Sequence, residues 1–131
     1  MLPINLLLQN RYRLIRLIGQ GGMGAVYEAV DQRLGHTVAI KQILRGDAHA
    51  FEREARLLAR LSHPALPKVS DHFAEEAGQF LVMEFIPGDD LAKSLLRQEA
   101  AFSVEKVLTW GDQLLDVLVY LHSQTPPVLH R

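Results

Sequence analysis

Cysteine is absent from the 131 residues of this sequence, which excludes disulfide bonds, thiolate catalysis and zinc sites built on cysteine. No apolar stretch approaches the roughly 18 residues that a membrane-spanning helix needs. Neither sign of charge dominates, because 14 Lys and Arg residues face 15 Asp and Glu residues, for a net charge of −1. This balance argues against a protein that binds nucleic-acid backbones in general. We therefore expect a cytoplasmic protein without a nucleic-acid partner or a membrane segment.

The composition is that of a globular protein, with 48% hydrophobic and 22% charged residues. The length suits one domain or part of a larger one. The first ten residues include the apolar run Leu6-Leu7-Leu8. They lack the basic start and the small-residue cleavage site of a secretory signal peptide. We interpret residues 1–10 as an N-terminal leader.

Hydrophobic patterns predict strands first and helices later. Runs rich in bulky and β-branched residues predict strands at 12–18, 25–30, 37–43, 66–73 and 79–84. A helical period over 48–61 ends before Pro64, as the conformational restriction ahead of a proline suggests. Beyond Pro87-Gly88 we expect a short helix from Asp89-Asp90 to about residue 98 and a long helix, capped by Ser103, to about residue 122.

The long predicted helix carries more apolar side chains than so little chain can cover. Seven aliphatic residues form its stripe, and their full burial would contribute at most about 10–20 kcal/mol. That upper bound is as large as the whole stability of a typical domain, about 5–15 kcal/mol. We expect this helix to need a partner surface. The stripe consists of Val104, Val107, Leu108, Leu114, Leu115, Leu118 and Leu121.

A glycine-rich motif follows the first predicted strand, with Gly19, Gly21 and Gly24 in the spacing GxGxxG. Glycines allow backbone N–H groups to approach a polyphosphate without obstruction by Cβ atoms. Three readings stay open on this segment alone: a hairpin turn without ligand, a hairpin flap over nucleotide phosphates, and a dinucleotide-binding turn. The dinucleotide site requires a helix directly after the glycines and an acidic residue about 20 positions later.

A lysine and a glutamate are expected to meet behind this loop. Lys41 lies between apolar neighbours in the predicted strand 37–43, where a cation is costly without an anionic partner. On the helix 48–61, Glu54 is the one acid that falls on the apolar stripe. The sequence therefore predicts an ion pair between Lys41 and Glu54. The arginines at 53, 56 and 60 fall on the opposite, solvent-facing side, where Glu52 can pair with Arg56.

These motifs, taken in order, resemble the amino-terminal lobe of protein kinases. The matching segments are the glycine motif with Val26, then Val38-Ala39-Ile40-Lys41, then Glu54. A later segment resembles the kinase hinge, Leu81-Val82-Met83-Glu84-Phe85-Ile86-Pro87-Gly88. The last four residues resemble the start of the catalytic loop, Val128-Leu129-His130-Arg131. The sequence around the glycines is most similar to that of bacterial eukaryotic-like serine/threonine kinases.

The resemblance implies an α+β, protein-kinase-like fold. It consists of an antiparallel five-stranded sheet with one packed helix over 11–86, followed by the first helices of an incomplete helical lobe over 87–131. It implies ATP as ligand, with Lys41 on the α- and β-phosphates and Glu54 holding Lys41. The other implied nucleotide-binding residues are Ile18, Gly19, Gln20, Gly21, Gly22, Met23, Gly24, Val26, Ala39, Met83, Glu84 and Ile86. Leu58, Val69 and His130 match a hydrophobic column that joins the two lobes.

The resemblance also implies residues that this sequence does not contain. The catalytic aspartate would follow Arg131, and the residues that hold Mg²⁺ in the complete family enzyme would lie further on. We therefore expect a serine/threonine protein kinase portion that binds ATP, whose complete form phosphorylates protein hydroxyls, and that is inactive in isolation. The alternatives are a non-catalytic kinase-like module that binds nucleotide or a partner and, less favoured, a dinucleotide-binding domain.

Overall fold

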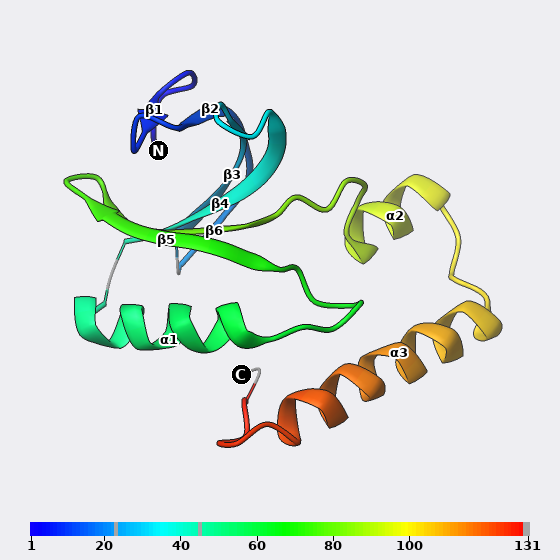
Figure 1. Ribbon diagram of the computed structural model, residues 1–131. Helices are drawn as coiled ribbons and strands as arrows, with labels where there is room; N and C mark the ends of the chain where they lie inside the picture. The colour runs from blue at the N-terminus through cyan, green and yellow to red at the C-terminus, as the bar shows by residue number, and fades with distance from the viewer. Residues whose placement is uncertain (23, 45, 130–131) are drawn as a thin grey trace. The chain divides into compact units, whose positions relative to one another are not determined.

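The computed structural model describes residues 1–22, 24–44 and 46–129 (Figure 1). The chain forms two compact units, Met1–Ser62 with Pro67–Ile86, and His63–Leu66 with Pro87–Arg131. The predicted α+β class is confirmed. The described residues form strands β1 (Leu7–Leu8), β2 (Tyr12–Gly21), β3 (Gly24–Asp31), β4 (His36–Ile43), β5 (Val69–Glu75) and β6 (Gly78–Glu84), and helices α1 (Ala48–Arg60), α2 (Leu91–Gln98) and α3 (Val104–His122).

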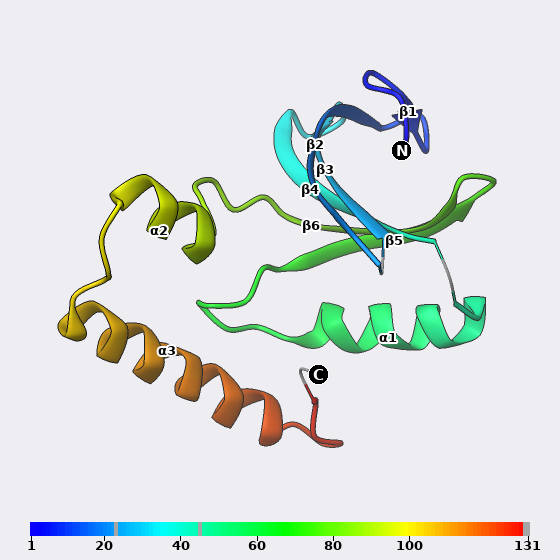
Figure 2. The same cartoon turned by 180° about the vertical axis from the view of Figure 1, so that it is seen from behind.

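The strands form one curled antiparallel sheet in the order β1-β2-β3-β4-β6-β5 (Figure 2). Short turns join β2 to β3, β3 to β4 and β5 to β6, which antiparallel pairing allows. β5 begins at Val69, three positions later than predicted. Residues 63–66 belong to the other unit, and Pro67 has no N–H to donate to a sheet.

The sheet has one strand more than the five predicted, because the leader contributes β1. Leu7 pairs with Arg13 and Leu8 with Tyr12. The N–H of Asn5 also donates to the carbonyl of Leu14 at 2.8 Å. The Leu8 side chain is 1% exposed and belongs to the main core. The apolar leader therefore packs as part of the sheet, where its leucines bury surface that would otherwise face water.

The two faces of the sheet differ in what covers them. Side chains alternate along a strand, so residues paired across antiparallel strands share a face. One row, Tyr27–Ile40–Val82, is fully buried and lies in the main core. The rows on either side of it point to the opposite face, where α1 packs on β5 and β6 (Figure 1).

Helix α1 is amphipathic, as its sequence period predicts. The Asp47 side chain caps its N-terminus by accepting from the N–H of His49. Phe51 and Ala55 are buried, and Ala55 lies in a second core cluster with Val69 and Leu81. The three arginines at 53, 56 and 60 are exposed, and Arg56 forms the predicted ion pair with Glu52. The predicted direction of the helix faces is thus confirmed for these residues.

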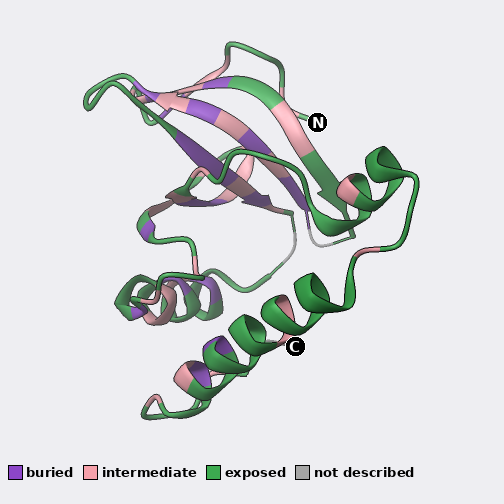
Figure 3. Ribbon diagram, turned by 90° about the vertical axis from the view of Figure 1, so that its right-hand side faces the viewer, coloured by how far each residue is buried: buried purple, intermediate pink, exposed green. Residues whose placement is uncertain are grey.

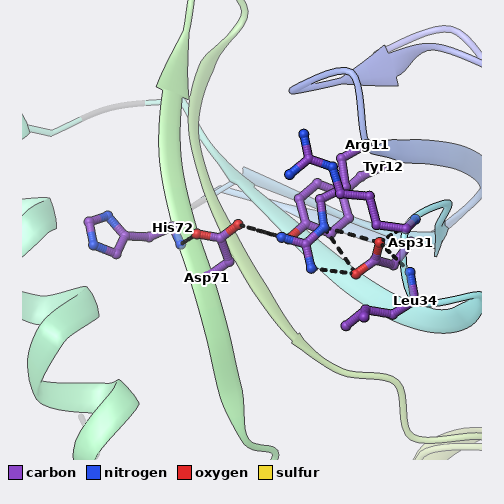
Figure 4. A network of polar contacts seen from close by, with 7 residues as sticks. Arg11, Tyr12, Asp31, Leu34, Asp71 and His72 are labelled. Carbon is purple, nitrogen blue, oxygen red and sulfur yellow. Dashed lines mark hydrogen bonds and ion pairs between the residues drawn. The ribbon is translucent and has the colours of Figure 1, made fainter.

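A polar network that we did not predict from the sequence ties the strands together at one end of the sheet (Figure 4). The carboxylate of Asp31, 2% exposed, accepts from the Arg11 guanidinium at 2.7 Å and from the backbone N–H groups of Arg33 and Leu34. These donors, Arg11 first, lower the pKa of Asp31 to about 2. Tyr12 donates to Asp71 at 2.7 Å, and burial raises the pKa of Tyr12 well above its usual range.

The second unit contains α2 and α3, and the predicted Ser103 cap of α3 is confirmed. Asp90 caps α2 by accepting from Lys93, and Ser103 caps α3 by accepting from Lys106. Most of the long helix is exposed (Figure 3), and its buried residues are Val117 and Leu121. Within the described residues, no helix is long and apolar enough to cross a membrane. Exposed members of the predicted stripe are Val104, Val107, Leu108, Leu114, Leu115 and Leu118.

Candidate functional site

The glycine-rich segment forms the tip of the hairpin between β2 and β3. Gly19, Gln20 and Gly21 end β2, and Gly24 begins β3, where it pairs with Gly21. Ile18 lies at an irregularity in the pairing between Leu17 and Gly19. A strand therefore follows the glycines, whereas the dinucleotide interpretation requires a helix there. Met23, one of the predicted nucleotide-binding residues, lies outside the described residues.

The glycines of the hairpin are required for different reasons. Gly24 has φ +137°, and a Cβ atom added there would lie 1.9 Å from the carbonyl oxygen of Gln42. The fold itself therefore demands glycine at this position. At Gly19, Gly21 and Gly22, by contrast, an added Cβ would meet nothing within 4 Å, and φ is not in the left-handed region. Folding of the described chain makes no such demand at these three positions.

Two rows of side chains extend from this hairpin across the open face of the sheet. Val26 on β3, Lys41 on β4 and Leu81 on β6 are cross-strand partners in one row. The next row consists of Glu28, Ala39 and Met83. The sheet thus brings together four predicted site residues, Val26, Ala39, Lys41 and Met83, on one face. Toward β6 the same face is covered by α1, where Leu58 and Met83 pack on the second core cluster.

The charges on this face leave a single cation available. Glu28 is 19% exposed and pairs with Arg16 of β2, so its carboxylate is neutralised. Lys41 is half-buried, and among the described residues it forms neither an ion pair nor a side-chain hydrogen bond. Its cross-strand neighbours Val26 and Leu81 are apolar. An ammonium group in such surroundings favours an anionic ligand.

Glu54 does not occupy the place that the helical period predicts. It is exposed, and no ion pair between the described residues joins it to Lys41. The reason lies in the packing of α1, which contacts β5 and β6 but makes no close approach to β4, the strand that carries Lys41. The expectation that Glu54 is buried is therefore wrong for this structure. Its role in holding Lys41 stays a prediction.

The segment after β6 offers a free backbone donor beside this face. Glu84 ends β6, and its N–H donates to the carbonyl of Lys68 at 2.8 Å. Ile86 follows in irregular backbone and is 59% exposed. Within the described residues the N–H of Ile86 has no hydrogen-bond partner. A free backbone N–H is the kind of donor that the edge of a purine base can accept from.

Two residues of the predicted hydrophobic column lie among the described residues. Val69 is buried in the second core cluster, and Leu58 packs against it. The third, His130, lies outside the described residues, as does Arg131. Among the residues that the structure describes, no group of three or more His, Cys, Asp and Glu side chains could hold a metal ion. No chemical step is therefore assigned to Mg²⁺ here.

The family to which the chain belongs is settled by comparison with known domains. Residues 12–131 match the family described as protein kinase domain. The chain belongs to this family. The protein kinase fold is thus confirmed from Tyr12 onward, including the glycine hairpin, the Lys41 strand and helix α1.

Curated relatives of this kinase-family chain include bacterial serine/threonine kinases. A probable serine/threonine-protein kinase, pknA2 of Bifidobacterium longum (strain NCC 2705), is 37% identical over 134 residues, which cover 95% of this chain and 17% of the relative. The serine/threonine-protein kinase pkn2 of Myxococcus xanthus is 42% identical over 136 residues, covering 98% of this chain and 16% of the relative. The chain therefore spans about a sixth of the length of these relatives.

A solved structure supports the same fold. The crystal structure of Rad53 1-466 in complex with AMP-PNP superimposes with a TM-score of 0.77 at 26% sequence identity. The match covers 86% of this kinase-family chain and 30% of that chain. The neighbour is described as a complex with a nucleotide analogue, and the matched region includes most of the sheet and helices of the present chain.

Proposed function

We propose that this chain is the ATP-binding portion of a serine/threonine protein kinase, which in complete form transfers the γ-phosphate of ATP to protein hydroxyls. One observation carries the proposal. An unpaired Lys41 lies on the same sheet face as a hairpin whose glycines at 19, 21 and 22 are not required by folding. Glycine at such positions is explained by a ligand that approaches the backbone closely.

The site residues divide among the parts of ATP. Backbone N–H groups of the hairpin and the ammonium of Lys41 would bind the phosphates, because the glycines let N–H groups approach closely and the ammonium supplies a full positive charge. Val26 and Ala39 would contact the flat faces of adenine, with Ile18 and Met83 at its edges. The Glu84 carbonyl and the Ile86 N–H would hydrogen-bond the base. Glu54 would pair with Lys41 once α1 approaches β4.

Binding of ATP tests this proposal on the 131-residue chain. Isothermal titration calorimetry with ATP and with adenosine should show tighter binding of ATP, because only ATP reaches Lys41 and the hairpin. Lys41→Met should weaken ATP binding about 10- to 100-fold, the effect of losing a charge-assisted hydrogen bond of about 1.5–3 kcal/mol. Adenosine binding should stay within about twofold, since its contacts lie away from Lys41.

Lys106→Met is the matched control, because Lys106 is an exposed lysine on α3 in the other unit. It removes the same charge and should leave both affinities unchanged. Equal effects of the two lysine substitutions would show that net charge, and not the site, governs ATP binding. Competition by NAD with an affinity above that of ATP would instead favour the dinucleotide interpretation.

We further propose that the isolated chain does not transfer phosphate. The aspartate that the family uses to orient the substrate hydroxyl would follow Arg131 and is not among these 131 residues. Phosphoryl transfer relies on positioning and electrostatic stabilisation, and a bound nucleotide alone provides neither for the acceptor. An assay with radiolabelled ATP and a general protein substrate should give the background rate. A rate like that of a complete kinase would contradict this proposal.

The proposed partners are ATP and, for the complete enzyme, a protein with an accessible hydroxyl. We also propose a cytoplasmic location, where ATP is available to the site. The near-neutral charge of the chain supports the absence of a nucleic-acid partner. A filter-binding experiment with duplex DNA at low salt should show no retention of the chain.

A further inference from the structure

The end of strand β4 carries a buried amide side chain that nothing in the nucleotide site uses directly. Gln42 is 5% exposed, and together with Asp31 it accounts for the polar side chains that the described residues bury. It follows Lys41 directly, so its side chain points to the opposite face, into the main core side of the sheet. There its Nε2 donates to the carbonyl of Ala77 in the β5–β6 turn at 2.8 Å.

Two other segments approach the backbone at this point. The Cα of Gly24 lies so close to the Gln42 carbonyl that a Cβ atom would be 1.9 Å from its oxygen. On the other side, a Cβ added to Gly78 would lie 3.2 Å from the Ile43 carbonyl oxygen and 3.8 Å from the Gln42 side chain. The start of β3 at Gly24, the end of β4 and the β5–β6 turn therefore meet around one residue. We call this contact, formed by Gly24, Gln42, Ile43, Ala77 and Gly78, the β4 junction.

We propose that Gln42 is a positioning residue that holds the glycine hairpin at the distance from the phosphates at which its N–H groups can bind them. The proposal rests on the proposed ATP site. A hydrogen bond from the Gln42 side chain joins the end of β4 to the β5–β6 turn. The backbone carbonyl of Gln42 packs directly against Gly24. The main chain at position 42 thus links the two elements that would bind the phosphates, the glycine hairpin and Lys41.

The β4 junction accounts for the presence of a polar group where an apolar one would pack more cheaply. A buried amide is favourable only when it is hydrogen-bonded, and the bond to Ala77 meets that condition for one donor. An apolar side chain of the same length would fill the space but remove the side-chain bond between β4 and the turn, leaving only the backbone pairing of Ile43 with Gln79 there. The hairpin would then lose a fixed support, whereas the adenine contacts on Ala39 and Met83 would keep theirs.

Gln42→Met tests this inference because methionine preserves the length of the side chain and removes the donor. ATP and adenosine affinities of the 131-residue chain are measured by calorimetry, and unfolding by urea titration. We expect the Kd for ATP to rise about three- to tenfold, the effect of one hydrogen bond. The Kd for adenosine, which lacks phosphates, should change less than about twofold. Amide hydrogen exchange in residues 21–26 should become faster in the folded protein.

Tyr12→Phe is the matched control, because it removes a different hydrogen bond, to Asp71, at the opposite end of the β2–β3 hairpin. It should lower stability while leaving the ratio of the two affinities unchanged. Should Gln42→Met not fold, Gln42→Leu serves as the second variant, since it also removes the donor and buries no charge.

Equal weakening of ATP and adenosine by Gln42→Met, or no weakening of either, would overturn the inference and leave Gln42 a purely structural residue. A wild-type chain that shows no preference for ATP over adenosine would instead contradict the proposed function, and this inference would fail with it. The two failures are distinguished by the wild-type titration alone.

Discussion

Replacing Gly24 by alanine should separate the two classes of glycine in the hairpin. The added Cβ would lie 1.9 Å from the Gln42 carbonyl oxygen, so β3 and β4 would have to move apart by about 1 Å before the contact became tolerable. The residue would also keep a φ of +137°, which costs about 1–3 kcal/mol for a side chain other than glycine. With the loosened pairing of β3 and β4 added, Gly24→Ala should destabilise the chain by about 2–4 kcal/mol.

Urea denaturation followed by far-UV circular dichroism measures this loss. For a domain of this size the midpoint should fall by about 1–3 M. Gly21→Ala is the control, because its Cβ meets nothing within 4 Å. It should leave the midpoint within about 0.5 M of the wild type and weaken ATP binding instead. A Gly24→Ala protein with the wild-type midpoint would refute the steric reasoning, and a Gly21→Ala protein with unchanged ATP affinity would refute the assignment of the open glycines to a ligand.

Two further predictions concern the stability of the first unit. The pKa of Asp31 falls from 3.8 in the unfolded chain to about 2 in the fold. Its ionised form therefore contributes about 2 kcal/mol to the stability above pH 4, and this contribution is lost as the pH falls toward 2. Asp31→Asn should lower the urea midpoint at pH 7 and flatten its decline in acid, whereas parallel curves would contradict the assignment. Leu8→Ala removes a side chain that is 1% exposed and should cost about 2–5 kcal/mol in a thermal melt, a loss comparable to that of any core leucine; a neutral result would show that residues 1–10 do not contribute to the fold.

Local patterns in the sequence were sufficient for the hairpin and the helices. The runs of bulky and β-branched residues on both sides of the glycines predicted two strands, and β2 and β3 confirm them. Ser103 was recognisable as a cap because a short polar side chain before an apolar period binds the first free N–H groups of a helix, and Asp89-Asp90 marked the start of α2. The amphipathic period of α1 predicted that Phe51 and Ala55 are buried.

The same period could not predict the environment of Glu54. A helical period gives the direction of a side chain around the helix axis, but it does not give the position of the helix against the sheet. Because α1 packs on β5 and β6, the part of its stripe that carries Glu54 does not face β4, and the carboxylate remains in water. The distance between two elements is a property of packing, which single-sequence patterns do not contain.

Long-range polar contacts were also missed, for a related reason. Asp31 bonds a guanidinium 20 residues earlier in the chain, and Tyr12 bonds a carboxylate 59 residues later. The donor of Gln42 reaches a carbonyl 35 residues away. None of these separations corresponds to a helical or strand period, so no local signal marks the partners. The Tyr12–Asp31 register, read from the expected pairing of the first two strands, would have placed Arg11 near Asp31.

The short strand β1 has a consequence for how the protein behaves at high concentration. Exposed strands at the rim of a sheet recruit strands from other molecules, because their unpaired N–H and C=O groups act as a template. Residues 5–8 cover the beginning of β2 by bonding Leu14 and pairing with Tyr12 and Arg13. The remainder of β2 is broken by two irregularities in its pairing, which disfavour a regular intermolecular ladder. A shortened chain that starts at Tyr12 would uncover the regular half of this rim and aggregate at concentrations where the intact chain stays monomeric.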